Sequence, residues 1–372
     1  MVYWQLFCLE IRNILTNSAI LMTVVGGLIF YSFLYPQPYL NQVPQEQKVA
    51  VLDNDNTPLS RRLIRMTDAT PQVYISDAVG SRQEAETLLN NREVSGLLLI
   101  PENFSSDILK HRSPTLVYAG DASYFLVYGT IAEGITNAAS ALDADIRLRR
   151  QRLENGRQVS GVLLNSYPVF NPNTGYLNYV IPAVFVLILQ QTLIIGSGIH
   201  GVTEQEQKDK RSDHLSTEVS SLGLLCTRLA AFLFIYTPFT LFYFGYCFTI
   251  YQITRFAEYS QMLSILLPFL LSVASLGCVL GKIIPRKELV TLVVLVSSIP
   301  LIFAAGFIWP KEAIPVWINW LVGWFPCTHA INAVYHLNQM GADFSEIRWE
   351  LLSLWGLLGL YFVMALLLFR KK

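Results

Sequence analysis

The sequence predicts a polytopic α-helical membrane protein with six transmembrane helices and one inserted extracytoplasmic α/β domain. Only 15% of its 372 residues are charged, whereas soluble domains carry about 25%. Most of these charges fall between Glu46 and Arg157, which indicates one water-soluble domain inserted into an otherwise apolar chain. The formal net charge of zero argues against a nucleic-acid-binding surface.

Residues 1–17 predict an amphipathic helix that lies in the cytoplasmic interface of the membrane. Tyr3, Phe7 and Ile11 recur at helical spacing, with Glu10 and Arg12 to the side. A simple extension of the first span is the alternative interpretation of the same periodicity.

Six apolar runs are long enough to cross a bilayer, which takes about 20 residues. The first is too long for a removed signal peptide and lacks the small-residue cleavage site. The predicted spans are 18–36, 176–199, 222–250, 259–281, 288–309 and 350–369. A further uncharged stretch contains Pro315 and Pro326, so residues 310–348 are predicted to form an extracytoplasmic re-entrant hairpin rather than a seventh span.

Basic residues indicate the orientation, because Lys and Arg concentrate in short cytoplasmic loops. They cluster in the loop after the second span, in the loop after the fourth span and at the C-terminus. With six spans these three segments lie on one side, which predicts that both termini and the 200–221 loop are cytoplasmic. The 37–175 domain then lies outside the cytoplasm.

The 37–175 domain alternates strand-like and helix-like segments. Buried strands are predicted at "KVAVLD", "QVYIS", "VSGLLLIP" and "TLVYAGD", and helices at "PLSRRLIRM", "SRQEAETLLNNRE" and "NFSSDILKH". This order indicates a small α/β domain with a mainly parallel sheet. A long helix over about 127–155 is predicted to return the chain to the membrane, with its arginines on a solvated face.

The pair Asp53 and Asp55 stands where a parallel strand ends, which is a common place for a ligand. A phosphoryl-transfer enzyme would use one carboxylate as nucleophile and the other to move the proton. Asp, Asn and Pro are also ordinary turn formers, and the other residues of such a site do not follow in the sequence. The preferred interpretation is a strand-to-helix turn, and a membrane-anchored hydrolase remains the alternative.

The sequence contains no phosphate-binding G-x-x-x-x-G-K-[ST] motif, so this chain is not expected to bind ATP itself. No metal or other cofactor site is predicted; His329 and His336 are interpreted as interfacial polar packing. The apolar cores of the six spans are interpreted as free of Asp, Glu, Lys and Arg, which argues against an ion-coupled carrier. Any energy that the protein uses should therefore come from elsewhere.

Two segments resemble ABC-2 type permeases, and specifically the bacterial drug-export subfamily with a large loop between its first two spans. "VAVLDNDNTPLSRRL" (49–63) is similar to the opening of that family's outside domain. "GFIWPKEAIPVWINWLVGWFPCTHAINAVYHLNQMGAD" (306–343) is similar to the signature that follows its fifth span. The family's cytoplasmic E-x-E-x-G-T-x-E run is only partly matched by "GVTEQEQKDKRSDHL", where Asp209, Lys210 and Arg211 replace the expected Gly-Thr.

The resemblance implies a non-catalytic permease subunit of the bacterial inner membrane. It implies a separate P-loop ATPase that binds the ATP, a second permease copy or paralogue, and in some systems a periplasmic adaptor. The residues implied in ATPase coupling are Glu204, Glu206, Lys208, Lys210 and Arg211. The residues implied in the hairpin or gate are Pro310, Pro315, Trp317, Phe325 and Pro326.

Aromatic residues of the third span suggest lipophilic or amphiphilic cargo. They are Phe232, Phe234, Tyr236, Phe239, Phe242, Tyr243, Phe244, Tyr246 and Phe248. Side chains that face lipid give the same composition, so both interpretations stay open. A membrane scaffold or sensor is a further alternative to the exporter, although the sequence shows no cytoplasmic output domain.

Overall fold

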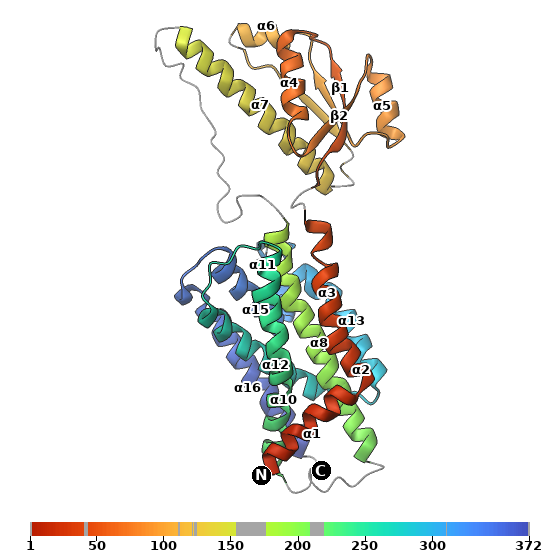
Figure 1. Ribbon diagram of the computed structural model, residues 1–372, viewed down its shortest axis with the longest axis vertical. Coiled ribbons are helices and arrows are strands. Elements are labelled where there is room, and N and C mark those ends of the chain that lie inside the picture. The colour runs from red at the N-terminus through yellow and green to blue at the C-terminus, as the bar shows by residue number, and fades with distance from the viewer. Residues whose placement is uncertain are drawn as a thin grey trace. The chain divides into compact units, whose positions relative to one another are not determined.

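The computed structural model separates into two compact units (Figure 1). Unit 1 comprises residues 1–40 and 168–372, and unit 2 comprises residues 41–167. The structure describes residues 2–40, 44–110, 112–120, 122, 125–153, 176–208, 219–309 and 311–370. Each unit has its own hydrophobic core and is described by itself.

Unit 2 is built around a four-stranded sheet with the strand order β2-β1-β3-β4. The central strand β1 pairs in parallel with β2 and with β3, and β4 is the one antiparallel strand, at an edge beside β3. The strands are β1 (Gln47–Asp53), β2 (Val73–Ala78), β3 (Gly96–Ile100) and β4 (Val117–Gly120). The sheet is therefore mainly parallel, as the alternating sequence pattern predicted.

Alternating side chains of the strands fill two cores on opposite faces of this sheet. Val49 and Val51 join one cluster with α4 (Pro58–Asp68), α6 (Phe104–Leu109) and α7 (Phe125–Leu153). On the other face, Ala50 and Leu52 pack against α5 (Arg82–Asn90). Ser81 caps α5 by accepting a hydrogen bond from the Glu84 amide, as the capping pattern predicts.

Two arginines of α7 make ion pairs with aspartates of the same helix, and one of these aspartates also pairs with an arginine of α4. Asp145 contacts Arg149 at 2.8 Å and Arg62 of α4 at 2.7 Å, and these side chains are partly exposed. Arg147 and Arg149, whose side chains the structure describes, are thus at least partly exposed and paired within the helix. Residues 154–175, which the sequence assigns to the end of this helix and the return to the membrane, lie outside the described residues.

Unit 1 contains, within its described residues, six helices long and apolar enough to cross a membrane. The first span joins α2 (Ser18–Leu21), a π-helical turn at Met22–Gly27 and α3 (Leu28–Leu34). The third joins α10 (Ser221–Leu241), a π-helical segment at Phe242–Cys247 and α11 (Phe248–Ile250). The other four are α8 (Leu177–Lys208), α12 (Tyr259–Ile283), α13 (Lys287–Ala304) and α16 (Arg348–Arg370).

Contacts between these helices define two ends of unit 1. At one end, α1 (Val2–Thr16) lies obliquely beside the start of α10, near the marked N- and C-termini (Figure 1). At the other end, the amide of Thr254, just after α11, donates to the side chain of Asn178 near the start of α8. We refer to these as the α1 end and the α11 end.

The helix α8 is the centre of unit 1, and 94% of its apolar window is buried. It crosses α12 at a stripe of small residues. A Cβ on Gly277 would lie 1.8 Å from the Ser197 hydroxyl, and one on Gly281 would lie 2.6 Å from the Gly198 carbonyl oxygen. Because only glycine fits here, the two helix backbones approach closely, as in other membrane helix pairs with glycines four residues apart.

The stretch 310–348 contains two short helices, α14 (Val316–Val322) and α15 (Pro326–Val334). The first residues of α15 lie deep within the bundle, because the Cys327 amide donates to Oε1 of the buried Gln190 on α8 at 2.8 Å. Four residues beyond α15, Asn338 has reached the α11 end, where its side chain donates to the Thr254 carbonyl. The part from α15 to Asn338 thus runs from the interior of unit 1 to its α11 end. Residues 310–348 are called the re-entrant segment below, after their predicted form.

Candidate coupling site

A group of ionisable side chains lies at the α1 end of unit 1. It brings together four helices that are far apart in the sequence. The members are Glu10 on α1, His200 and Glu204 on α8, Arg228 on α10 and Lys282 on α12. We call these five residues the ionic cluster.

Arg228 is the centre of the ionic cluster and bridges its two carboxylates. Its Nη2 lies 3.0 Å from Oε1 of Glu10, and its Nη1 lies 3.1 Å from Oε2 of Glu204. Nζ of Lys282 lies 3.2 Å from the same Glu204 oxygen, and Nε2 of His200 lies 2.6 Å from Oε2 of Glu10. Removal of Arg228 would leave the buried carboxylate of Glu10 without its guanidinium partner.

An aromatic ring on α16 completes the group. The Arg228 guanidinium lies 5.2 Å, and the Lys282 ammonium 4.5 Å, from the centre of the Phe369 ring. Cations at this distance from a ring are attracted to its π face. Through Phe369, a fifth helix of unit 1 contacts the ionic cluster.

Apart from the imidazole, the ionic cluster sets two carboxylates, Glu10 and Glu204, against two cations, Arg228 and Lys282. Burial alone would raise the pKa of the Glu10 carboxyl, but Arg228 and His200 outweigh it and hold that pKa below its ordinary value. Arg228 is only 1% exposed. Such an arginine is tolerated in an apolar bundle because both of its charge partners are within hydrogen-bond distance.

Two sequence-based expectations are wrong here. The third span was expected to be free of charged residues, but Arg228 lies within the predicted range 222–250 and is a buried residue of α10. Glu10 was placed to the side of the apolar face of the N-terminal helix, but Leu6, Glu10 and Ile14 together form its buried face. The four-residue spacing of those three residues is the sequence signal that could have revealed this.

The predicted coupling residues lie in different places. Glu204 belongs to the ionic cluster, and Glu206 is exposed two residues further along α8. Lys208 is the last residue of α8, so the first part of the expected 200–221 loop is helical. Lys210 and Arg211 lie outside the described residues.

The predicted hairpin residues lie at the helix starts of the re-entrant segment. Pro315 directly precedes α14 and Trp317 is exposed on it, whereas Phe325 directly precedes α15 and Pro326 is its buried first residue. Proline is favoured at such a first position because its missing N–H would have no partner there. Pro310 lies outside the described residues.

The aromatic residues of the third span do not form one continuous wall. The rings of Phe232, Tyr236 and Tyr243 are buried in the core of unit 1, whereas Phe234 and Tyr246 are exposed. Phe244 and Phe248 are also buried but line a groove between α10 and α12. The sequence composition did not distinguish these three environments, namely the core, the exposed surface and the groove.

The acidic turn of unit 2 is occupied by local hydrogen bonds. Asp53 accepts bonds from the amides of Asp55 and Asn56 and from the Ser60 hydroxyl. Asp55 accepts bonds from the hydroxyls of Thr57 and Ser105. Burial would raise the pKa of Asp55, but these hydroxyls outweigh it and lower that pKa. Both carboxylates therefore stabilise a strand-to-helix turn.

Comparison with known proteins connects this architecture to transport. The family model for "ABC-2 family transporter protein" matches residues 18–367. The chain is 24% identical to the inner membrane transport permease YhhJ of Escherichia coli (strain K12), over 97% of this chain and 95% of that protein. It is 20% identical to the probable multidrug ABC transporter permease YbhR of the same organism, over 95% of this chain and 94% of that protein. With a match over almost its whole length, the chain belongs to the ABC-2 family of transporter proteins.

Proposed function

We propose that the chain is the membrane permease of an ATP-driven exporter that moves lipophilic or amphiphilic compounds out of the cytoplasm or the inner leaflet. As a member of a transporter family it is a permease rather than an enzyme, and such permeases work with an ABC ATPase subunit. The proposal adds the direction of transport, the class of cargo and the surface that binds the ATPase. It places the α1 end and both termini in the cytoplasm and unit 2 outside.

The observation that carries the proposal is the ionic cluster. It joins the N-terminal helix α1 to α8, α10 and α12 through ion pairs of 2.6–3.2 Å. A partner that moves α1 or the end of α8 must therefore also act on the helices that cross the membrane. Coupling of this kind requires that the partner bind two arrangements of these helices with different affinity.

The different burial of the predicted coupling residues supports two separate roles for them. Glu206 is exposed at the end of α8, so we assign it to ATPase binding, together with the neighbouring Lys208, Lys210 and Arg211. Glu204 contacts Arg228 and Lys282, so we assign it to transmission of the movement within the permease. A second permease copy and, for unit 2, a periplasmic adaptor complete the proposed assembly.

The first test is copurification of the tagged permease from native membranes in mild detergent. A P-loop ATPase is expected in near-stoichiometric amount with the wild type, and less with Glu206→Lys. Glu288→Lys is the matched control, because Glu288 is an exposed glutamate at the same end of unit 1, in the first turn of α13. Absence of any ATPase from the wild-type complex would overturn the proposal.

The second test distinguishes binding from coupling. Glu204→Gln is expected to retain the ATPase in the pull-down. It should lose ATP-dependent transport of an amphiphilic dye, measured in whole cells or in inverted membrane vesicles. Equal loss of ATPase binding in Glu204→Gln and Glu206→Lys would show that the two residues do not have separate roles.

A further inference from the structure

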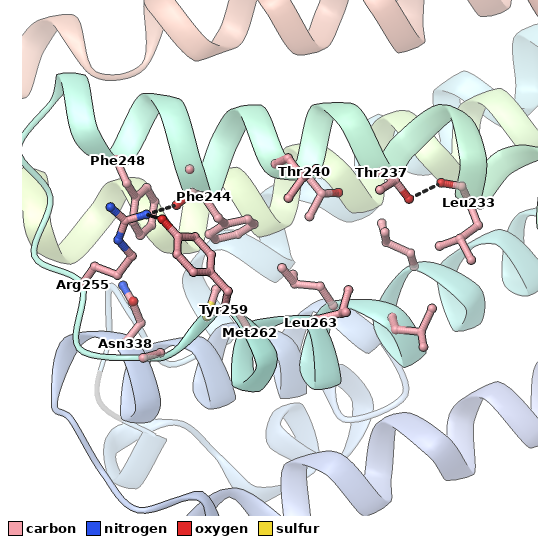
Figure 2. Close-up of a pocket in the computed structure, with 16 residues that line it drawn as sticks. Leu233, Thr237, Thr240, Phe244, Phe248, Arg255, Tyr259, Met262, Leu263 and Asn338 are labelled. Atoms are coloured by element: carbon pink, nitrogen blue, oxygen red, sulfur yellow. Dashed lines mark hydrogen bonds between the residues drawn. The ribbon is translucent and has the colours of Figure 1, made fainter.

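An apolar groove lies between the helices α10 and α12 (Figure 2). It has no part in the coupling mechanism proposed above. Its volume is about 240 Å³, below the ~300–1,000 Å³ typical of sites for small molecules. Leu233, Thr237 and Leu241 line it from α10, and Met262, Leu263 and Leu270 line it from α12. The hydroxyl of Thr237 donates a hydrogen bond to the Leu233 carbonyl of its own helix. The α10 wall of the groove is therefore mainly apolar.

The groove is open toward the surroundings of the bundle. Leu241 is 63% exposed and Leu263 is 61% exposed, on opposite walls. In a membrane, side chains exposed in this way contact lipid. A second feature of the groove is the π-helical segment Phe242–Cys247 in its α10 wall, a local widening of the helix that is frequent at functional sites.

A single arginine stands at the α11 end of this groove, as Figure 2 shows. Arg255 donates to the Tyr259 hydroxyl at 2.9 Å, and its guanidinium lies 5.2 Å from the centre of the Tyr259 ring. Among the described residues no carboxylate lies within ion-pair distance of it. Glu258, the other charged residue nearby, is at the start of α12 and contacts the Ser260 hydroxyl.

An unpaired acceptor lies close to this arginine. Asn338, which also lines the groove, is fully buried, and its Oδ1 has no hydrogen-bond partner among the described residues. Its amide nitrogen donates to the Thr254 carbonyl. Burial of an oxygen without a donor is unfavourable unless a bound molecule supplies one. A phosphate only accepts hydrogen bonds, so in a lipid this donor would be a hydroxyl of the head group.

The dimensions fit one leaflet of a bilayer. The α12 wall runs from Tyr259 to Leu270, roughly 17 Å at 1.5 Å per residue. Half of the hydrocarbon core is about 15 Å. A groove that begins at a cation and continues as an apolar surface to about the membrane centre matches a lipid with an anionic head and an acyl chain.

We propose that this groove binds one anionic phospholipid from the leaflet at the α11 end. The Arg255 guanidinium would hold the phosphate, and one acyl chain would lie between α10 and α12. This site goes beyond the exporter proposal and does not depend on it, because lipid binding by the isolated permease requires neither ATPase nor cargo.

The experiment is native mass spectrometry of the purified full-length permease with added dioleoyl phosphatidylglycerol or dioleoyl phosphatidylcholine. One phosphatidylglycerol is expected to be retained in preference to phosphatidylcholine. Arg255→Gln should weaken that retention about tenfold, as expected for loss of a hydrogen bond to a charged group. Arg348→Gln is the control, because Arg348 has a similar ring contact, 5.6 Å from Trp349, at the same end of unit 1 but outside the groove.

A second variant tests the apolar part of the site. A Cβ on Gly245, in the groove wall, would meet nothing within 4 Å, so Gly245→Leu is expected to fold and to fill the groove. It should reduce retention of phosphatidylglycerol, and Leu263→Trp should do the same from the opposite wall. Gly356→Leu is the control, since a Cβ there also meets nothing within 4 Å and Gly356 does not line the groove.

Three results would overturn the proposal. Equal losses in Arg255→Gln and Arg348→Gln would indicate a general surface-charge effect. Unchanged retention in both Gly245→Leu and Leu263→Trp would place the lipid elsewhere. A change of oligomeric state in these two variants, with lipid retention unaltered, would show that a second copy of the chain covers the groove.

Discussion

Two arginines near opposite ends of the third membrane-spanning segment have opposite environments. Arg228, in α10 at the α1 end, is 1% exposed and contacts the carboxylates of Glu10 and Glu204. Arg255, just beyond α11, is exposed and has a phenol hydroxyl, a ring and a backbone carbonyl as its nearest partners. The first charge is neutralised by other parts of this chain. The second is left to interact with something outside it.

Replacement of each arginine by methionine should give the largest difference in stability between the two positions. Arg228→Met is expected to destabilise unit 1 by about 3–5 kcal/mol, because two buried carboxylates lose their shared cation. Arg255→Met should change stability by no more than about 1 kcal/mol, as for an exposed charge. Thermal unfolding of the purified permease in detergent measures both. Equal destabilisation would mean that the burial of Arg228 has no energetic consequence.

The contact between α8 and α12 should have the next largest effect, because it positions Glu204 and Lys282 around Arg228. Gly281→Ala places a Cβ 2.6 Å from the Gly198 carbonyl oxygen, and overpacking of this kind costs about 1–3 kcal/mol. Gly359→Ala, where a Cβ meets nothing within 4 Å, is the control and should be neutral or slightly stabilising. The same unfolding measurement applies, and similar results for the two variants would contradict the close approach of α8 and α12.

Acidification should weaken the stabilising contacts of Arg228 more than those of Arg255. The pKa of Glu10 is lowered in the folded protein, although burial opposes this, because Arg228 and His200 stabilise its charged form. Its contribution to stability is therefore complete above its unfolded pKa of about 4.3 and is lost as the pH falls toward the lower folded value.

The measurement for this smallest effect is the unfolding temperature between pH 7 and pH 4. The wild type should lose more stability over this range than Glu10→Gln, because each unit by which the folded pKa is lowered corresponds to about 1.4 kcal/mol. The effect is limited because most of the loss occurs below pH 4. Identical pH profiles would show that Glu10 is not an ionised partner of Arg228.

Patterns local in sequence predicted much of the fold. The apolar runs indicated six membrane-spanning helices, and the alternation in unit 2 indicated a mainly parallel sheet with its capped helices. Both signals depend on neighbouring residues, which is why they can be read from one chain. The helical continuation of α8 to Lys208 was not predicted, because the charges after Ile199 resemble those of a loop.

The ionic cluster could not be predicted in the same way. Glu10 and Arg228 are 218 positions apart, and the contact depends on how α1 packs against α10. In the sequence, Asp53 and Asp55 are the conspicuous acidic pair instead, because only one residue separates them. Their partners are hydroxyls and amides of unit 2 itself, so they are the more local and the less informative acidic site.

The length of α8 has a mechanical consequence. Its 32 residues extend about 48 Å at 1.5 Å per residue, well beyond the ~30 Å of a hydrocarbon core. The sole proline of this helix, Pro182, is near its start, so the part from Ala183 to Lys208 has no proline joint. We therefore expect a tilt imposed at Lys208 to be carried along this part of the helix as far as Gln190. Because Gln190 holds the first residues of α15, the re-entrant segment must follow that tilt.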